Sequence, residues 1–162
     1  MDPSRLNAFL KALGEPGYRL KQILKAVHEG VSSYAQMTSL PALLRERLEK
    51  EMPLLSLEPE DVRSASNGSA HKARARLKDG LKVETVLMQP KPGLWSVCVS
   101  SQVGCALACN FCATGLMGFK RNLTAEEITD QLLFWKQFLT KQSSWPLLLG
   151  EAARSAGEGY SF

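Results

Sequence analysis

The chain has 162 residues, of which 44% are hydrophobic and 22% are charged, and its net charge is +4. This composition is typical of a soluble globular protein with one ordinary domain, or with a small domain joined to part of another. The first residues carry charges where a signal peptide would be apolar, and the apolar runs are far too short to span a membrane, so we expect a cytoplasmic protein.

The first 66 residues are predicted to be helical. Apolar residues at helical spacing predict three helices, at Pro3 to Leu13, Tyr18 to His28 and about Pro41 to Glu51. In the third helix, Leu43, Leu44 and Leu48 are expected to face inward. Three short amphipathic helices can form a small accessory domain, which we place at residues 1–66.

A β-hairpin is predicted at residues 67–90, where basic side chains alternate with apolar ones from residue 72 to residue 78. A two-residue turn would place basic and apolar side chains on the same face. A three-residue loop of Lys78, Asp79 and Gly80 sets Leu77 opposite Leu81 and keeps one face apolar. We therefore expect the longer loop, with Gly80 left-handed at a bulge.

The hairpin carries the excess charge of the chain. Between residues 70 and 82, five basic residues stand against the single acid Asp79, so the rest of the chain is balanced. Such a basic stripe suits contact with phosphates, and a solvated strand face is the alternative.

A loop is predicted next at residues 89–93, and a buried strand follows at Leu94 to Val99. A helix is predicted after the cysteine segment, at Leu123 to Leu139. Thr124 and Glu127 are expected to form a capping box at the start of the helix. Its core-facing residues are predicted to be Ile128, Leu132, Leu133 and Trp135 or Phe138. Strand, cysteine loop and helix are the opening unit of an α/β fold, whose loops after strands carry chemistry.

All the cysteines lie in one stretch, VCVSSQVGCALACNFCATGLMGF, as Cys98, Cys105, Cys109 and Cys112. In a reducing compartment, this clustering indicates metal or redox chemistry rather than disulfides. Zinc is one alternative, although structural zinc usually takes two well-separated ligand pairs and no histidine is near. A [4Fe–4S] cluster with four protein ligands is a second, and it would require Cys98. In the third, the last three cysteines hold a cluster whose fourth iron is open to a small molecule.

The wider stretch CVSSQVGCALACNFCATGLMGFKRNLTAEEI resembles the radical S-adenosylmethionine (SAM) methyltransferases that methylate carbon 2 of adenine in 23S rRNA and tRNA, the RlmN/Cfr-like family. EPGYRLKQILKAV, SSYAQMTSLPALLRERL and LKDGLKVETVLM resemble its helical region and hairpin. The resemblance covers roughly residues 5–140. It implies an α/β fold in which the helical domain and the hairpin are followed, at residues 91–142, by the first βα unit of a truncated radical SAM partial (β/α) barrel.

The resemblance implies that Cys105, Cys109 and Cys112 hold a [4Fe–4S] cluster, that its open iron binds SAM, and that Phe111 and Gly115 line the SAM pocket. One electron passing through the cluster would cleave SAM to a 5′-deoxyadenosyl radical. This chemistry is needed because carbon 2 of adenine is not nucleophilic. The implied partners are 23S rRNA and/or tRNA and an electron donor of the flavodoxin or ferredoxin type. Neither a membrane nor DNA is expected as a partner.

Further residues match family positions. Cys98 matches a cysteine that helps to resolve the protein–RNA adduct, with a small buried strand residue as the alternative. Glu84 matches a proton acceptor, with a cross-strand ion pair to Arg74 as the alternative. Lys120 and Arg121, which follow the cysteines, suit either a phosphate contact or solvated surface charge.

The resemblance ends after about Gln142, and residues 143–162 are predicted to be a divergent tail of the kind that a frameshift produces. The family's Gly-Glu-Pro motif has no match, and Cys112 is the last cysteine, whereas the family carries its methyl group on a cysteine near the C-terminus. We therefore expect that this chain alone does not complete methyl transfer. The alternative function is a non-catalytic remnant that binds a [4Fe–4S] cluster and/or structured RNA.

Overall fold

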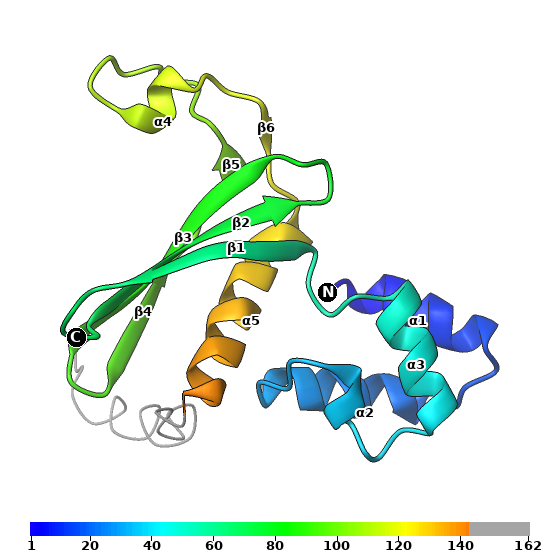
Figure 1. The fold of residues 1–162 in the computed structure, drawn as a ribbon. Coiled ribbons are helices and arrows are strands. Elements are labelled where there is room, and N and C mark those ends of the chain that lie inside the picture. The colour runs from blue at the N-terminus through cyan, green and yellow to red at the C-terminus, as the bar shows by residue number, and fades with distance from the viewer. Residues whose placement is uncertain (143–162) are drawn as a thin grey trace, which may run out of the picture.

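The computed structural model describes residues 1–142 (Figure 1). The predicted tail, residues 143–162, lies outside the described residues. In chain order, the elements are α1 (Pro3–Ala12), α2 (Tyr18–His28), the 3₁₀ turn η1 (Tyr34–Gln36), α3 (Ala42–Glu51), β1 (Leu57–Ser64), β2 (Ala70–Leu77), β3 (Lys82–Lys91), β4 (Leu94–Cys98), β5 (Gln102–Val103), α4 (Ala113–Leu116), β6 (Arg121–Asn122) and α5 (Ala125–Lys141).

The three predicted N-terminal helices are confirmed, and they enclose a core of their own. Leu44 and Leu48 of α3 are buried in it, one helical turn apart. Leu43 was predicted to face inward and is 77% exposed instead. One residue along a helix turns the side chain by roughly 100°, so a stripe set by Leu44 and Leu48 leaves Leu43 in solvent.

Four strands form an antiparallel sheet in the order β1-β2-β3-β4, and β5 and β6 form a separate two-stranded ladder. The predicted hairpin register between β2 and β3 is confirmed. The N–H of Leu77 donates to the carbonyl of Leu81 at 2.8 Å, and the N–H of Gly80 donates to the carbonyl of Leu77 at 2.9 Å. Gly80 has a φ of 82°, as a three-residue loop with a glycine bulge requires.

Strand β1 corrects the prediction that the first 66 residues are helical. Its sequence, LEPEDVRS, has no helical apolar stripe, and Pro59 would lack the N–H that a helix interior uses. An edge strand tolerates the proline, and β1 pairs only with β2, with a bulge between Pro59 and Asp61. The division into domains at residues 66, 90 and 142 stays a prediction.

Strand β4 is less buried than expected. Strand β3 continues to Lys91, so the predicted loop at 89–93 shrinks to a tight turn before Leu94. Leu94 is 52% exposed and Cys98 is exposed, because β4 is the other edge of the sheet. The observed fold is therefore mixed α/β, with N-terminal helices, a four-stranded antiparallel sheet and a long C-terminal helix.

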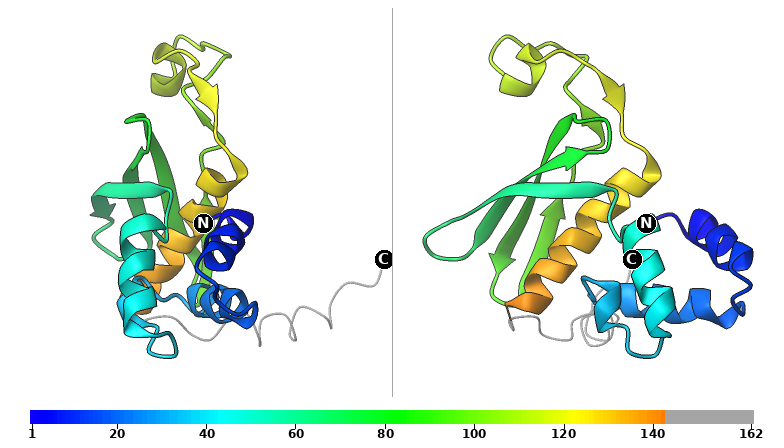
Figure 2. Two further views of the ribbon diagram at one scale, coloured as in Figure 1. Left: turned by 90° about the vertical axis from the view of Figure 1, so that its right-hand side faces the viewer. Right: turned by 45° about the vertical axis from the view of Figure 1, so that its right-hand side comes forward.

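Helix α5 lies against one face of the sheet and also borders the N-terminal helices (Figures 1 and 2). Its predicted capping box is present, with Thr124 and Glu127 each accepting the other's backbone N–H. Trp135 packs into the sheet core and is 1% exposed. Leu132 was predicted to face the core but is 48% exposed. The Gln137 side chain donates to the carbonyl of Val31 after α2, which ties the helix to the first core.

Candidate cysteine-loop site

The three clustered cysteines lie in one loop, residues 104–120, which we call the cysteine loop. It projects beyond the end of the sheet that carries the β2–β3 turn (Figure 1). The short β5–β6 ladder closes its neck, where the N–H of Lys120 donates to Val103 at 2.9 Å and that of Leu123 to Ser101 at 2.8 Å. The two ends of the loop are therefore hydrogen-bonded to each other.

Two glycines allow the ends of the loop to cross closely. A Cβ placed on Gly104 would lie 1.7 Å from the carbonyl oxygen of Gly118, which no side chain tolerates. Gly104 also has a φ of 73°, in the left-handed region that favours glycine. The neck thus depends on glycine for both its space and its backbone conformation.

The cysteines of the loop are free thiols, and all three are half-buried. Hydrogen bonds from the backbone N–H groups of Gly115 and Thr114, and from the Thr114 hydroxyl, lower the pKa of the Cys112 thiol. Helix α4 lies so close to Cys109 that a Cβ on Gly115 would be 2.8 Å from the Cys109 nitrogen. Gly115 is therefore needed for packing inside the loop, whatever it contacts besides.

The donor set matches an iron–sulfur cluster in kind, because thiolates are the ligands that such clusters take. The thiols are reduced, they share one loop, and Cys112 is biased toward the thiolate. The arrangement is not that of a formed metal site, since no group of three or more His, Cys, Asp or Glu side chains within residues 1–142 is gathered as metal ligands. The structure brings the cysteines onto one loop but does not converge them on one point.

The surface of the cysteine loop is strongly apolar. Phe111 is 93% exposed, and Leu107, Leu116 and Met117 are exposed as well. Exposed apolar side chains gathered on one loop are typical of a binding surface. The assignment of Phe111 and Gly115 to a SAM pocket stays a prediction.

Cys98 lies at the exposed end of β4, so the alternative of a small buried strand residue is wrong. Two linked hydrogen bonds that start at Trp135 of α5 hold its backbone in place. The indole N–H of Trp135 donates to the hydroxyl of Thr85 at 3.0 Å, and that hydroxyl donates to the carbonyl of Cys98 at 2.9 Å. Thr85 is 1% exposed, and no sequence motif predicted its role.

Gln131 of α5 is a second residue that the sequence analysis missed. Its fully buried amide accepts from the N–H of Ser100 at 2.8 Å and donates to the carbonyl of Ser100 at 2.9 Å. The Ser100 hydroxyl donates in turn to the backbone carbonyl of Glu84 at 2.6 Å. A glutamine one turn after the capping residue Glu127, on the core-facing side of the helix, was the available signal.

The Glu84 side chain forms a cross-strand ion pair, but its partner is Lys72 and not the expected Arg74. Its backbone lies opposite Arg74, but its carboxylate contacts the Lys72 ammonium at 3.0 Å. The side chain is 58% exposed, which leaves it open to a partner. Its role as a proton acceptor stays a prediction.

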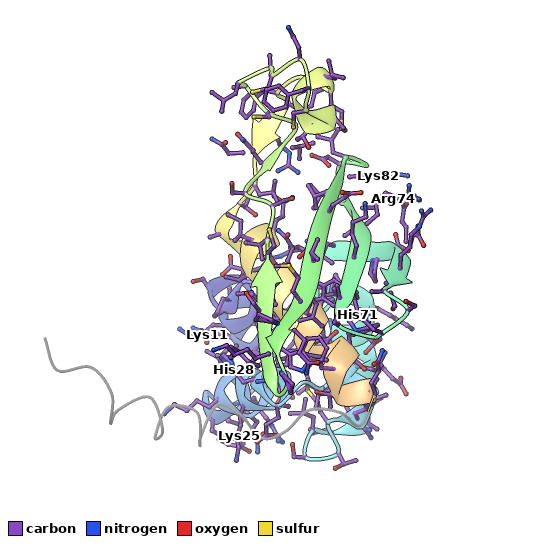
Figure 3. The ribbon with its side chains drawn as sticks, turned by 90° about the vertical axis from the view of Figure 1, so that its left-hand side faces the viewer. Lys11, Lys25, His28, His71, Arg74 and Lys82 are labelled. Atoms are coloured by element: carbon purple, nitrogen blue, oxygen red, sulfur yellow. The ribbon has the colours of Figure 1, made fainter. Side chains whose placement is uncertain are left out.

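The basic stripe of β2 is exposed, and much of it is paired with one carboxylate. Glu60, at the bulge of β1, contacts Arg74 at 3.4 Å, Arg76 at 2.6 Å and Lys82 at 2.9 Å. Hydrogen bonds from Lys82 and Arg76 lower the pKa of Glu60 to about 2. Figure 3 shows Arg74 and Lys82 together at one end of the sheet, away from the basic residues of the helical part.

Arg121 at the neck of the cysteine loop is not a freely solvated cation. Its side chain is 31% exposed, and its guanidinium contacts two carboxylates, those of Asp79 in the β2–β3 turn and Glu127 at the start of α5. The two carboxylates raise the pKa of Arg121 further above its usual value. Lys120, the adjacent cation, is exposed and takes part in no ion pair among residues 1–142.

An apolar groove of about 1070 Å³ lies between α2, β4 and α5. Its walls include Leu24, Trp95, Val97 and Leu132, and none of the predicted site residues lines it. Among the helices of residues 1–142, none combines the length and apolarity that a bilayer crossing requires.

The chain is similar to known proteins along most of its length. Residues 1–54 match the family model "Ribosomal RNA large subunit methyltransferase N-terminal domain". The chain is 42% identical over 132 residues to the ribosomal RNA large subunit methyltransferase Cfr of Shouchella clausii, covering 81% of this chain and 38% of that protein. It is 38% identical to a probable dual-specificity RNA methyltransferase RlmN of Carboxydothermus hydrogenoformans, covering 93% and 44%.

A solved structure also matches. The crystal structure of a radical SAM methyltransferase from Sphaerobacter thermophilus aligns with a TM-score of 0.73 and 38% identity, covering 98% of this chain and 42% of that one. The chain therefore spans about two fifths of the length of the relatives that it matches.

Proposed function

The chain belongs to the RlmN/Cfr family of radical SAM ribosomal RNA methyltransferases and spans the N-terminal two fifths of its members. On this premise, we propose that it provides the cluster-binding part of an enzyme that methylates carbon 2 of adenine in 23S rRNA and/or tRNA. The supporting observation is the cysteine loop itself, with three free thiols beyond the end of the sheet.

Cys105, Cys109 and Cys112 would hold a [4Fe–4S] cluster and leave one iron for SAM. When bound, this cluster supplies the electron that cleaves SAM. The chain's own groups prepare the ligands. The amides of Gly115 and Thr114 favour the thiolate of Cys112, and the bare α-carbon of Gly115 lets α4 pack against Cys109. The exposed ring of Phe111 is available to cover SAM.

Cys98 and Glu84 are proposed as catalytic residues. The Cys98 side chain is exposed at a strand end whose backbone is fixed by Thr85, so it is accessible to an RNA adduct. Glu84 would have to leave Lys72 to accept a proton, and a salt bridge between two half-exposed side chains is weak enough to exchange. Methyl transfer additionally needs the family's second, methyl-carrying cysteine.

We further propose that β4, the cysteine loop and α5 form the first βα unit of a partial (β/α) barrel. The remaining strands would continue from the free edge of β4, because that edge has no partner within residues 1–142. The setting is proposed to be the cytoplasm, with a flavodoxin or ferredoxin type of protein as electron donor.

The test is reductive cleavage of SAM by the anaerobically reconstituted chain. We expect 5′-deoxyadenosine to form with the parent and with Cys98→Ala, and to be absent with Cys112→Ala. Each variant removes one thiol, at Cys98 or at Cys112, so the pair separates cluster binding from adduct chemistry. Equal loss of cleavage in both variants would show that Cys98 is a cluster ligand and would refute this assignment.

A second candidate function is that of a non-catalytic chain that binds structured RNA through the basic face of the sheet. The exposed cations Lys72, Arg74, Arg76 and Lys82 favour it. Binding should weaken steeply with salt, and replacing Arg74 and Arg76 with alanine should reduce affinity. Unchanged affinity in that double variant would refute the idea.

A further inference from the structure

Arg121 links three elements at the neck of the cysteine loop. Its Nη1 and Nη2 atoms each lie 2.8 Å from an oxygen of Glu127, which is a bidentate contact. Its Nε and Nη2 atoms lie 2.7 and 2.6 Å from one oxygen of Asp79. One guanidinium on β6 thus joins the β2–β3 turn to the first turn of α5.

Both carboxylates are themselves fixed to the backbone. Asp79 accepts the N–H of Leu81 with its other oxygen at 3.0 Å, within the three-residue turn. Glu127 accepts the N–H of Thr124 at 2.9 Å in the capping box. The hydrogen bond from Leu81, followed by that from Arg121, lowers the pKa of Asp79, and Arg121 is the main cause of the lowered pKa of Glu127. The bridge therefore connects two rigid anchors and not two mobile side chains.

The neck needs such a bridge because its own ladder is short. β5 and β6 contribute only the pairs Gln102–Asn122 and Val103–Arg121, and an isolated two-stranded ribbon is marginal in water. Beyond the ladder, the loop presents exposed apolar side chains, among them Leu107, Phe111 and Leu116.

We propose that Arg121 is a positioning residue that holds the cysteine loop at a fixed place relative to the sheet and α5, so that Cys105, Cys109 and Cys112 can assemble around one metal cluster. The link to cluster assembly rests on the proposed function, whereas the ordering of the neck does not. Lysine cannot replace Arg121 fully, because a single ammonium lacks the planar fork that reaches both carboxylates at once.

The first test is amide hydrogen exchange on the cluster-free chain. In Arg121→Gln, exchange at the Lys120 and Leu123 amides should rise at least about tenfold, since a bidentate charged contact is lost, while β2 stays protected. In Arg121→Lys, the exchange rate at these amides should lie between those of the parent and Arg121→Gln. Lys120→Gln removes the neighbouring cation and should match the parent. Unchanged exchange at the neck in Arg121→Gln overturns the proposal.

The second test is the rate at which a chelator removes iron from reconstituted protein. Arg121→Gln should release iron several-fold faster than the parent, with Lys120→Gln unchanged. Should the parent take up no iron, the proposed function fails while the exchange measurement still decides the role of Arg121. If the parent takes up iron and Arg121→Gln keeps it equally well, the positioning role is wrong.

Should Arg121→Gln unfold the whole chain, Asp79→Asn provides the same comparison. It removes charge from one arm of the bridge and leaves the bidentate contact with Glu127 in place. Faster exchange at the neck with a protected β2 supports the proposal, and parent-like exchange contradicts it.

Discussion

At the scale of single residues, Glu60 sets the charge of the basic face. The bulge between Pro59 and Asp61 breaks the alternation of β1, and the Glu60 side chain lies among cations from β2 and β3 with 13% of it exposed. Hydrogen bonds from Lys82 and Arg76 stabilise its ionised form, so its pKa falls to about 2, and Arg74 contacts it at 3.4 Å. One carboxylate thereby holds together the cations that an RNA phosphate would contact.

Replacing Glu60 with glutamine should lower the free energy of unfolding at neutral pH. Because the folded pKa of Glu60 lies below its usual value of 4.5, its contribution is present above that value and is lost as pH falls toward about 2. Urea unfolding of parent and Glu60→Gln between pH 7 and pH 2 measures the difference. The gap in stability should shrink through that window, and a gap that is constant with pH would contradict the role given to Glu60.

The same substitution should affect RNA binding in the opposite direction. Glu60→Gln removes one negative charge from among three cations, so affinity for structured RNA should rise, and the salt dependence should steepen by about one unit of slope. Glu29→Gln removes the same charge from the helical part, where it pairs with Lys25 far from Arg74 in Figure 3, and should leave binding unchanged. Equal effects of both variants would mean that only net charge matters.

Thr85 should prove costly to change because its hydroxyl bonds to two groups, the buried Trp135 indole and the Cys98 carbonyl. Thr85→Val removes the acceptor of the Trp135 indole N–H and a donor to the Cys98 carbonyl, a loss of about 1–3 kcal/mol in the free energy of unfolding. Thr129→Val is the matched control, since Thr129 is exposed on α5 and bonds only within its own helix. Equilibrium urea unfolding gives both values, and similar losses would contradict the buried network.

At the scale of elements, local chemistry made the hairpin and α5 predictable. Gly80 and the alternation of β2 determined the turn, and Thr124 with Glu127 marked the start of the helix. Strand β1 was not predictable in the same way, because the bulge at Glu60 and the presence of Pro59 remove its alternation. Its strand conformation depends on pairing with β2, which is a long-range contact.

The neck of the cysteine loop should tolerate no side chain at Gly104, where the two ends of the loop cross. Gly104→Ala should destabilise the chain by more than Gly68→Ala, although both glycines have positive φ near 70°. Each change carries a backbone strain of about 1–2 kcal/mol, and only Gly104 adds a clash with the backbone of Gly118. Thermal unfolding compares the two. Equal losses would show that the ends of the loop do not cross closely.

At the scale of the whole molecule, α5 joins the helical core and the sheet core, and no sequence pattern predicts that one helix contacts both. Phe134 and Trp135 pack into the sheet core, Leu133 packs against the helical core, and Gln137 bonds to Val31. Helix α5 is apolar on several sides, and a single-face pattern therefore misassigned Leu132. Which of its faces meets which core depends on the tertiary arrangement.

The sequence predicted the ligands of the candidate site but not the ion pairs that surround it. Cysteine spacing and the flanking motif identified the three proposed ligands. The partners of Arg121 and Glu60 come from distant strands and turns, so no local pattern shows which cations are paired. Sequence therefore left the basic stripe and Arg121 as either phosphate contacts or solvated charges, where the structure has ion-pair networks.

The most direct measurement of the central claim is Mössbauer spectroscopy of the chain reconstituted with iron-57 and sulfide without oxygen, before and after SAM is added. Three thiolate ligands predict about four irons per chain, of which one changes its signal when SAM binds. Four irons that are all indifferent to SAM, or a colourless chain that takes up zinc instead, would contradict the account.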